Sequence, residues 1–84
     1  MRILAVDDDP VFLEQILAGL GTLGYRDVVT AQSAEQALGW IDKASPAFDC
    51  FLLDIKMPGT SGIELCARIR KLQIYRRTPI VMVT

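Results

Sequence analysis

Four short runs of mostly apolar residues, separated by segments with helical periodicity, constrain the fold more than any other feature of this sequence. Continuous apolar runs are typical of strands that are covered on both faces, as in a parallel sheet. Strands that alternate with helices are joined by right-handed crossovers, which again gives a parallel sheet. We therefore expect an α/β fold in the order β-α-β-α-β-α-β, with strands at residues 3–6, 28–30, 48–53 and 80–83.

The segments between these runs carry the start and stop signals of helices. Each begins with a side chain that suits an N-cap: Asp9 before Pro10, Ser33 with Gln36 three residues later, and Ser61 with Glu64. Gly24 and the segment Ala44-Ser45-Pro46 are expected to end the first two helices. The residues expected to face the sheet are Phe12, Ile16 and Leu20, then Ala37, Leu38 and Ile41, then Leu65, Ile69 and Leu72.

Composition argues against several classes of function. The chain has 84 residues and a net charge of -1, so it is one small domain at most and lacks the basic excess that attracts nucleic acid or an anionic membrane. No apolar run approaches the roughly 20 residues of a transmembrane helix, and the first run is too short for a signal peptide, which predicts a cytoplasmic protein without membrane contact. Without histidine, imidazole chemistry is excluded. Cys50 and Cys66 lie in apolar segments without CxxC spacing and are expected to be reduced core thiols.

Three of the predicted strands end at a polar side chain. Asp7 and Asp8 follow the first strand, Asp54 follows the third, and Thr84 follows the fourth. Ligands of doubly wound sheets bind beyond the carboxyl ends of the strands. Because parallel strands end at the same edge, the three aspartates converge if the first and third strands are neighbours.

Three neighbouring carboxylates repel one another, and a divalent cation would relieve the repulsion. Oxygen-only ligands that leave positions for water and phosphate suit magnesium better than calcium. Magnesium and a free carboxylate beside it are the groups required for phosphoryl transfer onto that carboxylate, which yields an acyl phosphate.

Taken one at a time, these residues have simpler interpretations. Asp7 and Asp8 could belong to an acidic loop at the positive end of the first helix, and Asp9 could be only its cap. Asp54 could be a turn residue, and Thr84 an ordinary strand residue. Their coincidence at the ends of three strands of one sheet favours a functional site.

At these positions the sequence resembles the receiver domains of two-component response regulators. The matching segments run from Ile3 to Pro10, from Leu52 to Gly59 with Gly62 three residues further on, and from Pro79 to Thr84. The resemblance implies a doubly wound, flavodoxin-like receiver fold with strand order 2-1-3-4. It also implies that residues 1–84 belong to one receiver domain, of which they form the N-terminal portion.

The resemblance also implies roles for single residues. Asp54 would be the phosphoacceptor. Asp7, Asp8 and Asp54 would hold a magnesium ion, together with the backbone carbonyl of Lys56. Thr84 would be the switch hydroxyl that bonds the phosphoryl group.

The sequence departs from the family's pattern in one respect. A complete receiver has a fifth strand, two further helices and an invariant lysine at the end of the fifth strand, and none of these has a counterpart up to Thr84. The sequence is therefore expected to be the N-terminal portion of a receiver. Strand 80–83 would then be an apolar edge with unpaired backbone groups, which predicts self-association through this edge.

The implied function is to accept a phosphoryl group from the phosphohistidine of a sensor histidine kinase or a histidine phosphotransfer protein, and to promote part of its own dephosphorylation. Two alternatives from other classes remain open. One is an interaction or dimerisation module that resembles a receiver and is never phosphorylated. The other is a phosphohydrolase of the haloacid-dehalogenase kind, because Asp7 and Asp9 also form an Asp-x-Asp motif, although that interpretation leaves residues 54–59 unexplained.

Overall fold

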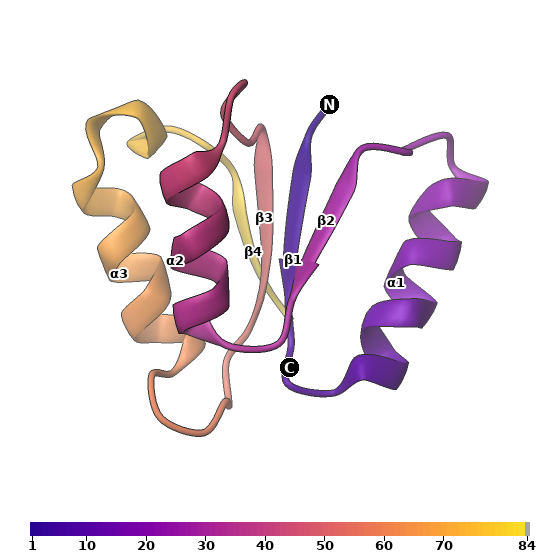
Figure 1. Cartoon of the computed structure of the whole chain (residues 1–84), viewed down its shortest axis with the longest axis horizontal. Coiled ribbons are helices and arrows are strands. Elements are labelled where there is room, and N and C mark those ends of the chain that lie inside the picture. The colour runs from indigo at the N-terminus through magenta and orange to yellow at the C-terminus, as the bar shows by residue number, and fades with distance from the viewer. Residues whose placement is uncertain (84) are drawn as a thin grey trace.

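The computed structural model describes residues 1–83, which form a four-stranded sheet with helices on both faces (Figure 1). All paired strands are parallel, and their order is β2-β1-β3-β4. The predicted doubly wound α/β fold and its strand order are therefore confirmed. The strands are β1 (Ile3–Val6), β2 (Val28–Ala31), β3 (Cys50–Asp54) and β4 (Ile80–Val83), and the helices are α1 (Pro10–Thr22), α2 (Ala34–Lys43), α3 (Gly62–Lys71) and the short 3-10 helix η1 (Gln73–Tyr75).

The helices begin where the capping side chains predict. Asp9, Ser33 and Ser61 each accept a backbone N–H of the first helical turn, at 3.0, 3.1 and 3.2 Å. One detail differs from the expected capping box, because the Gln36 side chain accepts the N–H of Gln32 at 2.6 Å and not that of the cap residue. These bonds satisfy donors that have no partner within the helix. They fix the points at which the strand-to-helix loops end.

The main core lies between the sheet and the pair α2 and α3, whereas α1 alone covers the opposite face (Figure 1). Burial of apolar area is the main favourable term in folding, so this layer carries most of the stability. On β3 the alternate residues Phe51 and Leu53 are fully buried. The buried members of this core are Leu4, Val6, Ala31, Ala34, Ala37, Ile41, Phe48, Phe51, Leu53, Met57, Leu65, Ile69 and Tyr75.

An aromatic group closes one end of this core. The ring of Phe51 packs edge-on against Tyr75, with centroids 5.0 Å apart, and lies 5.7 Å from the ring of Phe48. The third strand begins at Cys50 and not at Phe48, so the predicted start was wrong by two residues. Phe48 is buried ahead of the strand because its N–H donates to the Tyr75 hydroxyl at 3.2 Å, which takes the place of a strand partner.

Other expectations about single elements also needed correction. β2 includes Ala31, one residue beyond the predicted end. Leu72 does not face the sheet from α3. The backbone turns extended at this residue, which ends the helix and leaves 40% of the side chain exposed. In α1 only Leu13 is buried, and the predicted inner residues Phe12, Ile16 and Leu20 are partly buried.

Both cysteines are free, and each is partly buried. Cys66 packs against the main core. Burial raises the pKa of the Cys50 thiol, which disfavours the reactive thiolate. These findings agree with the expectation of two reduced thiols.

Helix length and the position of β4 in the sheet relate to two further expectations, the absence of a membrane span and an edge strand at residues 80–83. Among the described residues, no helix is long and apolar enough to span a bilayer. In the described sheet β4 is an edge strand, and Val81 on it is 48% exposed. Pairing of two copies along β4 stays a prediction.

Candidate functional site

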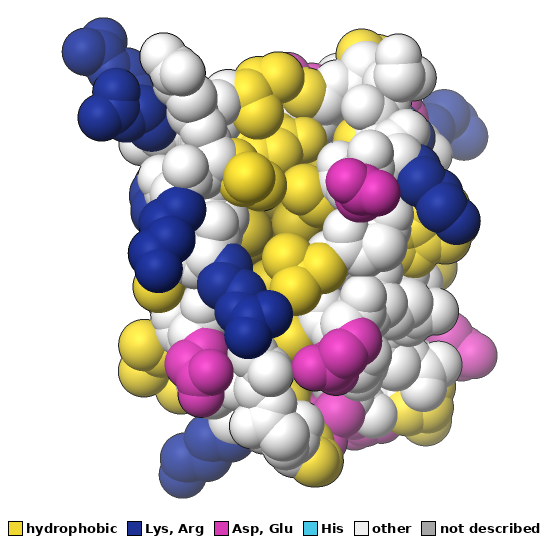
Figure 2. Space-filling view, turned by 60° about the vertical axis from the view of Figure 1, so that its left-hand side comes forward, with side chains coloured by type: hydrophobic (Ala, Val, Ile, Leu, Met, Phe, Trp, Pro, Cys, Tyr) yellow, Lys and Arg dark blue, Asp and Glu magenta, His cyan; other side chains and the backbone are white. Residues whose placement is uncertain are grey.

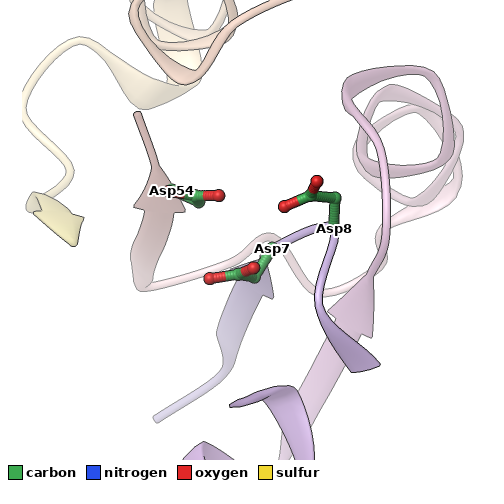
Figure 3. Close-up of side chains that lie close together, drawn as sticks. All are labelled: Asp7, Asp8 and Asp54. Carbon is green, nitrogen blue, oxygen red and sulfur yellow. The ribbon is translucent and has the colours of Figure 1, made fainter. Parts of the chain in front are cut away.

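Three carboxylates meet at the carboxyl ends of β1 and β3. In the register of the sheet, Val6 pairs with Leu53, so the residues that follow each of them leave the sheet side by side. The carboxylate oxygens of Asp7, Asp8 and Asp54 lie within 4.8 Å of one another. Figure 3 shows Asp8 and Asp54 directed toward each other, with Asp7 close to both. The predicted convergence of these residues is confirmed.

The three carboxylates differ in their surroundings. Asp7 is only 8% exposed, and its Oδ1 accepts the N–H of Asp9 at 2.9 Å. Asp54 is partly buried, and its Oδ1 accepts the N–H of Lys56 at 3.3 Å. Asp8 is exposed. The Asp7 carboxylate is thus buried, the Asp54 carboxylate is partly buried and bonded to its own loop, and the Asp8 carboxylate faces solvent.

Burial and the neighbouring carboxylates both act on the ionisation of Asp7. Burial is the largest cause that raises the pKa of the Asp7 carboxyl above its usual value of 3.8, and the charges of Asp54, Asp8 and Asp9 raise it further. The hydrogen bond from the Asp9 N–H acts in the opposite direction and lowers the pKa. The fold therefore disfavours the ionised form of Asp7.

We expect Asp7→Asn to stabilise the metal-free protein at neutral pH. A carboxyl whose pKa is raised on folding destabilises the fold once the pH exceeds that folded-state pKa, and this penalty vanishes below the unfolded value near 3.8. Asparagine keeps an oxygen for the Asp9 N–H and cannot ionise. The free energy of unfolding, measured with urea in the presence of a chelator, should rise by about 0.5–2 kcal/mol at pH 7.

The pH dependence provides the control for this variant. The advantage over the wild type should shrink as the pH falls from 7 to about 3.5, because Asp7 itself then becomes neutral. Comparing the two proteins at each pH removes the contribution of all other carboxyls. An Asp7→Asn protein that is less stable than the wild type at pH 7 would show that the ionised cluster is not a source of strain.

The loop between β3 and α3 presents Asp54. Pro58 fixes its own φ, and Gly59 has a φ of +76°, a backbone conformation that favours glycine. Further on, the N–H of Gly62 donates to the carbonyl oxygen of Ile55 at 3.0 Å. A Cβ at Gly62 would lie only 1.9 Å from the backbone carbonyl oxygen of Asp54, so α3 can begin this close to β3 only because the residue is glycine.

The acidic cluster fits a small hard cation. Two oxygens that bind one octahedral magnesium ion at about 2.1 Å lie roughly 3 to 4.2 Å apart. The spacing of up to 4.8 Å in the cluster approaches this value, so small side-chain rotations of the exposed Asp8 and half-exposed Asp54 would complete it. A bound cation would offset the burial and the neighbouring charges that disfavour the ionised form of Asp7. Asp7, Asp8 and Asp54 are therefore suited to hold magnesium.

The remaining predicted site residues have different outcomes. Thr84 lies outside the described residues. The Lys56 side chain is exposed, and a role of its backbone carbonyl as a metal ligand stays a prediction.

One contact near the site could not be predicted from the sequence. The Thr60 hydroxyl donates to the Glu35 carboxylate at 3.2 Å and ties the loop to the start of α2. The two residues are 25 positions apart, and no local pattern pairs them.

Comparison with known proteins agrees with this geometry. The response regulator receiver domain family matches residues 3–84. The transcriptional regulatory protein AruR of Pseudomonas aeruginosa is 38% identical over 99% of this chain and 34% of its own length. The histidine-protein kinase BarA of Shigella flexneri is 38% identical over 100% of this chain and 9% of its own length. The chain thus spans about a third of the transcriptional regulator and a small part of the kinase.

Solved structures show the same fold. The chemotaxis protein CheY4 of Vibrio cholerae superimposes with a TM-score of 0.88 and 34% identity, covering 96% of this chain and 65% of that one. A chain in the crystal structure of histidine kinase ThkA in complex with response regulator protein TrrA gives a TM-score of 0.86 and 37% identity, covering 99% and 67%. With the family match over nearly the whole sequence and the acidic cluster at the expected edge, this chain belongs to the family of response regulator receiver domains.

Proposed function

We propose that this receiver accepts a phosphoryl group on Asp54 from the phosphohistidine of a histidine kinase or a histidine phosphotransfer protein. The observation that carries the proposal is the position of Asp54, a half-exposed carboxylate with two further carboxylates within 4.8 Å. An Asp54 oxygen forms the new bond to phosphorus while the bond from phosphorus to the imidazole nitrogen breaks, which leaves an acyl phosphate on the protein.

The neighbouring residues have supporting roles in this proposal. Asp7, Asp8, Asp54 and the backbone carbonyl of Lys56 would hold magnesium, which would neutralise the charge of the phosphoryl oxygens. The N–H of Lys56 already orients the Asp54 carboxylate. The Thr84 hydroxyl is proposed to bond the phosphoryl group once it is attached.

The likeness to a chain from a kinase–regulator complex supports the choice of partner. The names of the relatives do not agree on one output: some are transcriptional regulatory proteins, and one is itself a histidine kinase. We therefore propose only the class of phosphodonor. The downstream activity that a receiver controls differs among these relatives and resides in the parts of them that this chain does not match.

The hydrolase alternative is disfavoured by the place of Asp9. Its side chain caps α1 by accepting the N–H of Val11 at 3.0 Å. The carboxylates that cluster are Asp7, Asp8 and Asp54, and Asp9 is not among them. The second acid of an Asp-x-Asp motif is therefore engaged as the cap of α1 and is not one of the clustered carboxylates.

One experiment separates the three candidate functions. The 84-residue protein is incubated with magnesium and a small acyl phosphate, and its intact mass and the remaining phosphodonor are followed over time. A receiver gains a single phosphoryl group, which is removed slowly. A hydrolase consumes the donor over many turnovers without a stable adduct, and an interaction module does neither. Either of the last two results would contradict the proposal.

We expect Asp8→Ala to weaken magnesium binding by at least about tenfold. Magnesium prefers its own waters, and removing one of three carboxylates leaves too little charge to replace them. Asp8 is exposed, so the fold should be unaffected. Isothermal calorimetry at fixed ionic strength measures the affinity, with Asp42→Ala as a control that removes an exposed carboxylate from α2. Equal affinities of the Asp8→Ala protein and the wild type would place the metal elsewhere.

A further inference from the structure

An open apolar groove of about 650 Å³ lies between the C-terminal half of α2 and the η1 turn. Leu38 and Ile41 form its α2 wall, Leu72 and Ile74 form its opposite wall, and Tyr75 also lines it. Figure 2 shows it as a strip of apolar side chains that runs down this face of the molecule. The groove is separate from the carboxylates, which lie at the edge where α2 and α3 begin. We refer to it as the α2–η1 groove.

The wall formed by η1 is held rigidly by the rest of the fold. Tyr75 is 2% exposed and anchors the turn in the core. An Arg70 guanidinium nitrogen (Nη1) donates to the carbonyl oxygens of Tyr75, Arg76 and Thr78, at 2.9, 3.2 and 2.6 Å. The chain path after α3 is therefore fixed, and the groove is preformed.

Two large apolar side chains on this wall keep much of their surface exposed. Ile74 is 68% exposed and Leu72 is 40% exposed. Single exposed apolar residues are common, but here they border an apolar groove that the buried Ile41 also lines. A concave apolar surface with protruding apolar rims is typical of a site that receives side chains of another molecule.

The charges around the groove are asymmetric. Five of the nine Lys and Arg residues of the chain lie between positions 68 and 77, and no acidic residue follows Glu64. None of these cations lines the groove itself, and the Arg70 guanidinium is already bonded to backbone carbonyls. The other four lie in the last turn of α3 and just after η1, and Figure 2 shows Lys and Arg along one side of the apolar strip, so the flank beside the groove is basic. The α2 wall carries both signs, since Asp42 lines the groove and Lys43 is its neighbour.

We propose that the α2–η1 groove docks an amphipathic helix of a partner protein, with its apolar stripe in the groove and acidic residues on the flank that faces α3 and η1. Apolar anchors at positions i, i+3, i+4 and i+7 of a helix are the usual occupants of such a groove. The basic flank favours acids on that side of the bound helix, whereas the α2 wall, with Asp42 next to Lys43, offers no such excess of positive charge.

The shape argues for a helix over the other anionic partners. The phosphates of a nucleic acid would pair with the arginine side chains, but the apolar walls of the groove would then face phosphates and sugars. An anionic membrane would take up the exposed Leu72 and Ile74 but would not reach Leu38 and Ile41, which are less exposed in the groove. Only a partner that combines an apolar stripe with adjacent acids uses both features. The proposal is independent of phosphorylation at Asp54.

The test uses the 84-residue protein and two fluorescent helical peptides of about 18 residues. Both carry the same leucine stripe. One has glutamate on the flank that would face α3, and the other has lysine at the same positions. Fluorescence anisotropy should give a dissociation constant of about 10–100 µM for the glutamate peptide and at least about tenfold weaker binding for the lysine peptide. Trp40, the only tryptophan, lines a hollow beside the groove and provides a second signal.

Matched variants locate the binding. Ile74→Glu should weaken binding of the glutamate peptide by at least about tenfold, because it places a charge on the apolar wall. Ile63→Glu is the control: Ile63 is 63% exposed on α3, similar to Ile74, and does not line the groove. The double variant Arg76→Gln and Arg77→Gln should reduce the preference for glutamate over lysine. Thermal melts of the variants should match that of the wild type, since all these side chains are exposed.

Several outcomes would overturn the proposal. These are absence of binding by the glutamate peptide at millimolar protein, equal binding of the two peptides, or equal losses in Ile74→Glu and Ile63→Glu. Tighter binding to a DNA duplex or to phosphatidylserine vesicles than to the glutamate peptide would assign the basic flank to those ligands. Binding that prefers glutamate and is lost only with the groove variants is the result we expect.

Discussion

Asp54→Asn should abolish uptake of a phosphoryl group from a small acyl phosphate, lowering labelling at least about 100-fold. The amide has no anionic oxygen to attack phosphorus. It retains the shape of aspartate and an oxygen that can accept the N–H of Lys56, so the loop should stay in place. Intact mass spectrometry after incubation with magnesium and the phosphodonor measures the effect.

Two controls make this result specific. Asp42→Asn removes an exposed carboxylate on α2 and should label like the wild type. The melting temperature of Asp54→Asn should equal or exceed that of the wild type without magnesium, because one charge of a repelling cluster is gone. Labelling of Asp54→Asn to the same extent as the wild type would show that another residue is the acceptor.

The sequence predicted those parts of the fold that depend on local signals. Apolar runs mark buried strands, and the side chains of Asp9, Ser33 and Ser61 each cap the helix that they were expected to begin. Strand order came from the resemblance to receivers, because pairing between distant strands leaves no local pattern. Once β1 and β3 were taken as neighbours, the meeting of Asp7, Asp8 and Asp54 followed from the geometry of a parallel sheet.

The features that were not predicted arise from contacts between distant residues. Phe48 belongs to an apolar run, but the Tyr75 hydroxyl, 27 positions away, binds its N–H ahead of the strand. Tyr75 is itself a core residue, and it lies in the η1 turn, which no sequence pattern predicted. Leu72 fits the helical spacing of α3, but the helix ends one residue before it. In each case a tertiary contact or a chain reversal, which periodicity cannot reveal, decides the structure.

The same limit applies to the site. The sequence identified three carboxylates but could not rank their surroundings, because the place of Asp7 depends on a distant contact, its N–H donating to the carbonyl of Ala31 at the end of β2 at 3.1 Å. Its neighbour Asp8 is exposed although the two are adjacent in the chain. Burial therefore raises the pKa of Asp7 in particular, while Asp8 is exposed and Asp54 is only partly buried, so both are accessible to an ion and a phosphodonor.

Gly62→Ala should destabilise the protein by about 3 kcal/mol or more. The new Cβ would lie 1.9 Å from the backbone oxygen of Asp54, 2.7 Å from its carbonyl carbon and 3.1 Å from the Cα of Ile55. All three are backbone atoms of β3 and the residue after it, so no side chain can rotate away. The start of α3 must move from the sheet, which would break the bond from the Gly62 N–H to the Ile55 oxygen and shift Asp54.

A second glycine provides the matched control for this prediction. Gly19 lies within α1, and a Cβ there would meet nothing within 4 Å, so Gly19→Ala should stabilise by about 0.5–1 kcal/mol through helix propensity. Urea unfolding followed by circular dichroism measures both variants. A domain of this size has only about 4–12 kcal/mol of stability, so Gly62→Ala should lower the midpoint sharply. It should also slow labelling at Asp54 in the fraction that remains folded, since the atom it displaces belongs to that residue. A loss below about 1 kcal/mol with normal labelling would mean that α3 can retreat from β3 without disturbing the acceptor.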